Sequence, residues 1–270
     1  MKAIKHITAG LLHIEVIGQV PEPTIWRARA GRSQPTSKAQ SFYNLKSSWR
    51  ELELMLAANF GAKDMVLTLT YDDDHLPQDK AEAGKLFQKF VTKLRAVRRR
   101  RDEELLYIYC IEGFHGKTSD PLWGDDCELE DRRLHHHAVV NRIGPDDLEE
   151  IRSLWPYGGY IRAEPLDVHY YRELAKYMTK EARDFGRGKP GERTWRGSRN
   201  LEKYSVEYIE IASDSVTLAP PGGAVDYTSF CDKNPYGFAE CIGARYLLFP
   251  TAPRPGLSYT VGRPKPKPKH

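Results

Sequence analysis

The chain is poor in the features that mark membrane proteins, disulfide-bonded proteins and zinc knuckles. It has only four cysteines among 270 residues, and no two of them form a CxxC pair. No apolar run approaches the ~18 residues that a membrane-spanning helix needs, and the N-terminus has no secretion pattern. We therefore expect reduced thiols and a cytoplasmic protein that has no membrane partner.

A strong excess of one charge is also missing, because 41 basic residues face 37 acidic ones and the net charge is +4. The basic residues are nevertheless clustered, within 95–101, 183–199 and 263–269. Separate basic patches on a nearly neutral chain indicate a phosphate-bearing partner.

The order of hydrophobic segments in the middle of the chain predicts the fold class. Strand patterns at 65–71, 105–111, 134–141 and 157–164 alternate with helix patterns at 79–101, from Pro145 onward and at 168–184. Two of these strands follow one another with no helix between them, which favours antiparallel pairing. The sequence therefore predicts an α+β fold with a central antiparallel sheet flanked by helices.

Composition also suggests a division of the chain. Residues 1–60 read as an N-terminal appendage that has a strand at 11–17 and a helix at 38–59, and 61–200 as the central domain. Residues 201–262, with strand patterns at 204–212 and 244–249, read as a C-terminal extension packed on that domain. The alternating lysines and prolines of 263–270 predict a disordered tail.

The segment Arg133–Asn141 has the period of two that is typical of a strand, which puts His135 and His137 on one face. Two imidazoles and a carboxylate can hold Mg²⁺ or Mn²⁺, and zinc also fits these ligand types. Glu112, near the end of the preceding strand, is the favoured third ligand. The alternatives lie on the polar loop that follows: Glu128, Glu130 and Asp131.

A nucleophile can come from the helix pattern at 168–184. Tyr177 and Lys180 are three residues apart, so they share one helix face, and a neighbouring cation can stabilise a phenolate. Tyr170 and Tyr171 are further candidates in the same segment. A metal, a nucleophile and positive charge are together what phosphodiester cleavage requires.

Three motifs, in this order, resemble those of the HUH endonucleases that initiate rolling-circle replication: Leu67-Thr68-Leu69-Thr70-Tyr71, His135-His136-His137 and Tyr177-Met178-Thr179-Lys180. The resemblance is nearest to initiators of small single-stranded DNA phages and of related plasmids and prophages. It covers roughly 65–185, less than half of the chain. One departure is His136, since the family usually has a bulky hydrophobic residue at this position.

The resemblance implies a role for each matching residue. His135 and His137 would bind the metal, Tyr177 would attack DNA to form a 5′-phosphotyrosine bond, and Lys180 would assist. Glu112 before Gly113 is similar to a Glu-Gly pair in the phage group, which supports Glu112 as a ligand. The implied fold is the HUH architecture, which resembles an RNA-recognition fold.

The implied partners are single-stranded DNA at a replication origin, a host polymerase that extends the freed 3′ end, and a host helicase. A helicase is expected because the chain has no GxxxxGK[ST] loop. The stretch after the tyrosine helix is similar to a basic segment of phage initiators. Aromatic rings among arginines can stack bases and hold phosphates, so four residues are predicted to bind DNA: Arg193, Trp195, Arg196 and Arg199.

Other functions fit parts of the same pattern. A single-tyrosine transposase or a plasmid relaxase would use the same chemistry, although relaxases usually have their tyrosine ahead of the histidine motif, whereas Tyr177 follows it. A non-catalytic nucleic-acid-binding module would keep its affinity for DNA in a chelator and would never cut.

Overall fold

The computed structural model describes residues 2–19, 38–114, 132–158, 160–180, 193–211, 216–232, 241–250 and 259–261. The chain divides into two compact units, one formed by Met1–Ala30 with Lys203–His270 and the other by Gly31–Glu202. Each unit contains an antiparallel five-stranded sheet, and four α-helices are found in the described ranges. The fold is α+β, as the sequence predicts, and is consistent with an HUH architecture.

The sheet of the unit 31–202 has its histidine-bearing strand in the centre. The strands follow one another across the sheet in the order β6 (Ile161–Pro165), β3 (Met65–Leu69), β5 (Arg132–Val140), β4 (Tyr107–Phe114) and β7 (Arg196–Gly197). Every neighbouring pair is antiparallel. Because β4 and β5 pair directly, the prediction that these two successive strands are antiparallel is confirmed.

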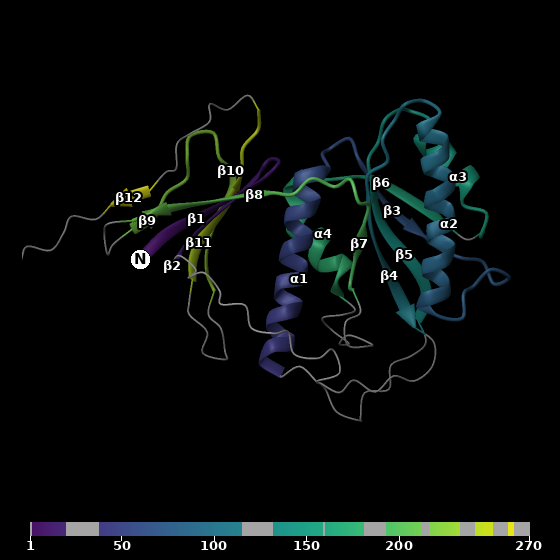
Figure 1. The fold of residues 1–270 in the computed structure, drawn as a ribbon, viewed down its shortest axis with the longest axis horizontal. Helices are drawn as coiled ribbons and strands as arrows, with labels where there is room; N and C mark the ends of the chain where they lie inside the picture. The colour runs from purple at the N-terminus through teal and green to yellow at the C-terminus, as the bar shows by residue number, and fades with distance from the viewer. Residues whose placement is uncertain are drawn as a thin grey trace, which may run out of the picture. The chain divides into compact units, whose positions relative to one another are not determined.

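Helices cover both faces of this sheet (Figure 1). One face carries α2 (Lys80–Arg99) and α3 (Asp147–Leu154), and the other carries α1 (Lys38–Asn59) and α4 (Tyr171–Met178). A short 3₁₀ turn, η1 (Val168–Tyr170), leads into α4. The predicted helix at 38–59 agrees with the observed bounds of α1.

The hydrophobic core lies between the sheet and α2. On β3 buried and half-buried residues alternate, so Leu67 and Leu69 point into the core. Phe87 of α2 stacks on Tyr109 of β4 with ring centroids 4.0 Å apart. Each large apolar side chain buried here contributes about 1.5–3 kcal/mol. This packing fixes the sheet and leaves its other face available for polar groups.

The sheet of the other unit joins the two ends of the chain. Its order is β10 (Val225–Asp232), β11 (Cys241–Leu247), β2 (Leu12–Gln19), β1 (Lys2–Ala9) and β8 (Ser205–Glu210). A two-stranded sheet pairs β9 (Val216–Leu218) with β12 (Tyr259–Val261). The strand β1 and its pairing with β8 were not predicted.

The domain division at 1–60, 61–200, 201–262 and 263–270 remains a proposal, and the tail 263–270 lies outside the described residues. In the described ranges, no helix is both long enough and apolar enough to cross a membrane.

Candidate metal and nucleophile site

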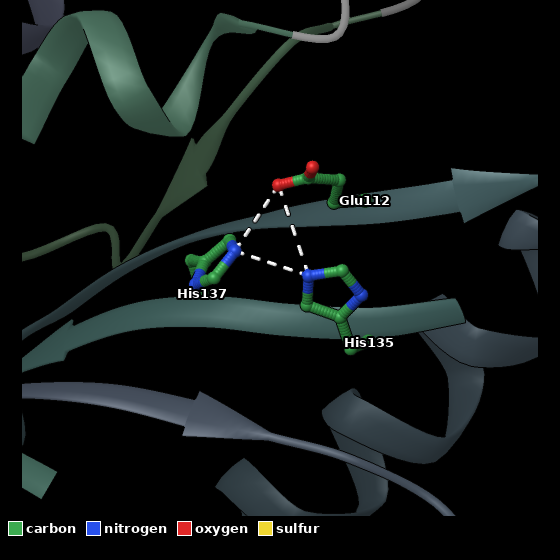
Figure 2. A group of neighbouring side chains, drawn as sticks. All are labelled: Glu112, His135 and His137. Atoms are coloured by element: carbon green, nitrogen blue, oxygen red, sulfur yellow. Dashed lines mark hydrogen bonds and ion pairs between the residues drawn. The ribbon is translucent and has the colours of Figure 1, made fainter. Parts of the chain in front are cut away.

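The pairing of β4 with β5 brings Glu112 beside the two predicted histidine ligands. Glu112 is directly opposite His135, and Cys110 is opposite His137. Since side chains alternate along a strand, Glu112, His135 and His137 all project from the same face of the sheet. Figure 2 shows the three side chains converging from these two strands.

The donor atoms of this triad lie close together. The Nε2 atoms of His135 and His137 are 3.1 Å apart, and Oε2 of Glu112 is 3.1 Å from Nε2 of His137 and 3.7 Å from Nε2 of His135. Atoms that each lie about 2.1 Å from one ion at nearly right angles are about 3 Å apart. The triad therefore has the spacing of a metal site, and the group could hold a divalent ion.

The second nitrogen of each ring supports this conclusion. Nδ1 of His135 lies 3.0 Å from the carbonyl oxygen of Arg133, which can only accept a hydrogen bond, so Nδ1 carries the proton and Nε2 has a free lone pair. Nδ1 of His137 lies 3.3 Å from Oγ1 of Thr68. Such outward hydrogen bonds orient histidine ligands in metal sites, and the residues present thus fit a metal ion.

The protonation states also suit a cation. Burial alone would raise the pKa of Glu112, but hydrogen bonds from His137 and Lys180 lower it to about 2, so the carboxylate is ionised at neutral pH. Burial lowers the pKa of His135, which keeps its ring neutral. Metal ions bind ionised carboxylates and neutral imidazoles.

The helix α4 brings Tyr177 and Lys180 to the same place. The Nζ atom of Lys180 lies 2.9 Å from Oε1 of Glu112 and 4.1 Å from the centroid of the Tyr177 ring. The ring of Tyr177 also meets that of His137 edge-on, with centroids 4.8 Å apart. Burial would lower the pKa of Lys180, but the hydrogen bond and the charge of Glu112 raise it, so the side chain is a cation.

The three tyrosines of this segment have different environments. Tyr171 is fully buried, and its hydroxyl donates a hydrogen bond to the carbonyl of Phe60. Tyr170 is exposed on η1, and Tyr177 is 45% exposed beside the triad. Among these three, only Tyr177 combines solvent access with contacts to both His137 and Lys180.

His136 points away from the triad, into the core. It is fully buried among aromatic rings, and its Nε2 lies 2.6 Å from the hydroxyl of Tyr71. Phe87 lies against it, with ring centroids 5.0 Å apart. Burial lowers its pKa, so it packs as a neutral ring. The family's usual hydrophobic position is therefore filled here by an imidazole with one polar partner.

The four predicted DNA-binding residues do not form one group. The Nε1 atom of Trp195 donates to the carbonyl of Ser48 on α1 at 3.2 Å. Arg196 is opposite Tyr109 in the pairing of β7 with β4, so it projects toward α2 instead. Arg193 and Arg199 are exposed. The other candidate metal ligands, Glu128, Glu130 and Asp131, lie outside the described residues.

Two residues with supporting contacts were not singled out in the sequence. Thr68 contacts His137, and its place opposite His137 in the pairing of β3 with β5 explains why a polar residue interrupts an apolar strand. Arg133 donates to the carbonyl of Tyr71 at 2.8 Å and forms an ion pair with Asp73 at 2.6 Å, which anchors the start of β5. Their signal was the first motif itself, read across the sheet.

Comparison with known families gives one match, between residues 64–182 and a family of replication-associated proteins of the ORF2 type. The matched segment begins just before β3 and ends just after Lys180, so it contains the triad and Tyr177. The match confirms the resemblance carried by the three motifs and is consistent with a rolling-circle replication initiator. Comparisons with curated proteins and with solved structures gave no match.

Proposed function

Since residues 64–182 match this family of replication-associated proteins, we propose that the chain nicks single-stranded DNA at a replication origin. Tyr177 is the proposed nucleophile, and Glu112, His135 and His137 are the proposed ligands of Mg²⁺ or Mn²⁺. The nick starts rolling-circle replication. The family match supports a role in replication initiation, and the site chemistry supports the nick.

In the proposed reaction the phenol oxygen of Tyr177 attacks the scissile phosphorus. A bond forms between this oxygen and phosphorus, and the bond from phosphorus to the 3′ oxygen breaks. The phenol proton passes to solvent, to which the ring is open, and the leaving oxygen takes a proton from solvent. The products are a 5′-phosphotyrosine and a free 3′-hydroxyl. The new ester keeps the energy of the phosphodiester, so a later 3′-hydroxyl can reverse the attack and join the ends.

Lys180 supports the nucleophile in this scheme. A tyrosine hydroxyl has a pKa near 10 in water and is a weak nucleophile until positive charge stabilises its phenolate. The ammonium of Lys180 lies against the Tyr177 ring and is held there by Glu112. A bound divalent ion would add polarisation of the phosphoryl oxygens.

A single observation carries the proposal. One cation, Lys180, contacts both the carboxylate of the metal triad and the ring of the tyrosine. A structural metal site would not need an exposed tyrosine at its edge, and a packing tyrosine would not need a buried carboxylate and two imidazoles.

The test compares Tyr177→Phe with Tyr170→Phe, which changes another exposed tyrosine of the same segment. Each variant is incubated with Mn²⁺ and labelled single-stranded fragments of the replicon that encodes the chain, and covalent adducts are counted on a denaturing gel. We expect Tyr177→Phe to bind DNA and form no adduct, and Tyr170→Phe to form adduct at the wild-type rate. An adduct that persists in Tyr177→Phe would refute the assignment.

The remaining partners follow from the products. A free 3′-hydroxyl primes a host polymerase, and a host helicase would separate the strands. Arg193, Trp195, Arg196 and Arg199 remain proposed contacts to DNA.

A further inference from the structure

A basic groove with a volume of about 610 Å³ lies along the exposed side of α2. Four cationic side chains line it: Lys85, Lys89, Lys93 and Arg196. Neither the catalytic proposal nor the family match accounts for this feature. We call it the α2 groove.

The three lysines form a stripe. They are spaced four residues apart, so they lie above one another on one side of the helix. The only acidic residue of α2 is Glu82, and it is engaged at the start of the helix, where its carboxylate accepts a hydrogen bond from the backbone of Gln78 at 2.7 Å. Like charges four residues apart destabilise a helix, so this stripe opposes local stability and indicates a polyanionic partner.

Arg196 reaches the groove because of the register of β7. It is opposite Tyr109 and shares the sheet face that carries α2. Gly84 leaves room for it, since a Cβ atom built on Gly84 would lie 3.8 Å from NH1 of Arg196. The floor is fixed by a hydrogen bond of 3.2 Å between Gln88 and the hydroxyl of Tyr109.

The lining chemistry selects the kind of partner. The lining includes no aromatic residue and no carboxylate. Sites for single-stranded nucleic acid combine cations with aromatic rings on which bases stack, and such rings are lacking here. A row of cations alone fits the phosphate backbone of a duplex, which is contacted without reading sequence.

We propose that the α2 groove binds the phosphate backbone of duplex DNA. It lies on the sheet face opposite the one that carries His137, so it is separate from the cleavage site. The inference rests on the proposed function in one respect, which is that the duplex is the DNA flanking the nicked strand. The groove would hold this duplex while the single strand reaches Tyr177.

The experiment measures binding of the full chain to a blunt DNA duplex of mixed sequence and to a single strand of the same length. A chelator is present, so no nicking occurs and binding is separated from catalysis. The groove variant is Lys85→Gln with Lys89→Gln, and the matched control is Lys63→Gln with Lys203→Gln. All four lysines are exposed, and both variants remove two charges.

Each lost phosphate contact reduces the slope of log affinity against log salt by about 0.9 for a duplex. We therefore expect the groove variant to lower the duplex slope by about 2 and to leave single-strand binding close to wild type. The control should keep both slopes. Circular dichroism checks folding, and the groove variant should melt no lower than wild type because two repelling charges are gone.

Equal losses in the groove variant and the control would overturn the proposal, as would an unchanged duplex slope in the groove variant. A loss as large on the single strand as on the duplex would overturn the assignment to duplex DNA. The nicking proposal fails separately, through the absence of a Mn²⁺-dependent adduct in the wild-type chain.

Discussion

The Nζ atom of Lys180 lies 2.9 Å from Oε1 of Glu112, so an ion pair joins α4 to the central sheet. Oε2 of the same carboxylate lies 3.1 Å from His137. Glu112 thus divides its two oxygens between the proposed catalytic cation and the proposed metal site. The position of Lys180 against Tyr177 depends on this division.

Replacement of Lys180 by methionine tests its role. Lys180→Met keeps the length of the side chain and removes the charge, so the developing phenolate loses its neighbouring cation. We expect the single-turnover rate of adduct formation at saturating DNA to fall on the order of 10²-fold. Binding of DNA in a chelator should change far less than the rate.

The matched control is Lys176→Met, one turn earlier on α4. The ammonium of Lys176 lies 5.3 Å from the centroid of the Trp49 ring and forms no ion pair with the triad in the described structure. We expect this variant to keep the wild-type rate at saturating DNA. Equal rate losses in the two variants would mean that the charge of the helix as a whole, and not the placement of Lys180, affects the reaction.

Metal binding can be measured without DNA. Titration with Mn²⁺, followed by the loss of the free-ion signal in electron paramagnetic resonance, should show one site in the wild-type chain. His137→Ala should weaken this site by at least about 10–100-fold, since even the loss of an outer partner of a ligand costs that much. At about 100 times its Kd, Mn²⁺ should add roughly 2.7 kcal/mol to the free energy of unfolding of the wild type.

His75→Ala is the control for loss of an imidazole. His75 is exposed and bonded to Asp72, with its Nδ1 atom 2.7 Å from the carboxylate. This variant should bind Mn²⁺ as the wild type does. A wild-type chain that binds no Mn²⁺, or a His137→Ala variant that binds it unchanged, would remove the basis for the metal assignment.

The sequence could predict the shared face of His135 and His137 because a period of two is a local property. It could favour Glu112 as a partner but could not derive its place. That place depends on the register between β4 and β5, which long-range pairing sets and which is not written in either strand alone. The strand β4 also continues past its expected end, to Phe114, so Glu112 lies within the strand.

Two other features were beyond local patterns. Trp195 and Arg196 diverge because neighbouring side chains on a strand alternate, and β7 is only two residues long, too short to show a period. The pairing of β1 with β8 joins segments about 200 residues apart, as in Ile4 with Ile209. Hydrophobic patterns predict that such strands exist but not which strands they pair with.

The buried pair of Tyr71 and His136 should show strong energetic coupling. Tyr71→Phe leaves Nε2 of His136 without its partner, and His136→Leu leaves the tyrosine hydroxyl without its own. Each single variant should lose about 1–3 kcal/mol of unfolding free energy, while the double variant should lose much less than the sum because both polar groups are gone. Urea denaturation measures all four chains of the cycle.

The same variants separate stability from metal binding. His136 faces the core, away from the triad, so the Mn²⁺ affinity of folded His136→Leu should equal that of the wild type. Losses that add without coupling would contradict the hydrogen bond. A loss of Mn²⁺ binding would contradict the separation of the two faces.

Two glycines of the unit 31–202 should respond to alanine in opposite directions. A Cβ atom on Gly84 would lie 3.6 Å from Ile111 and 3.8 Å from Arg196, which are ordinary contact distances. Because glycine in a helix costs about 0.5–1 kcal/mol relative to alanine, Gly84→Ala should raise the free energy of unfolding by that amount. A Cβ atom on Gly197 would lie 2.5 Å from Leu201 and 3.3 Å from the backbone oxygen of Tyr107.

Gly197→Ala should therefore lower the free energy of unfolding by about 1–3 kcal/mol, the usual cost of overpacking. Urea denaturation of both variants gives the two signs, and each serves as the control for the other. A stabilising Gly197→Ala would mean that β7 does not lie against β4 as closely as the pairing of Gly197 with Ile108 requires. In that case the place of Arg196 beside α2, and with it one wall of the α2 groove, would also be wrong.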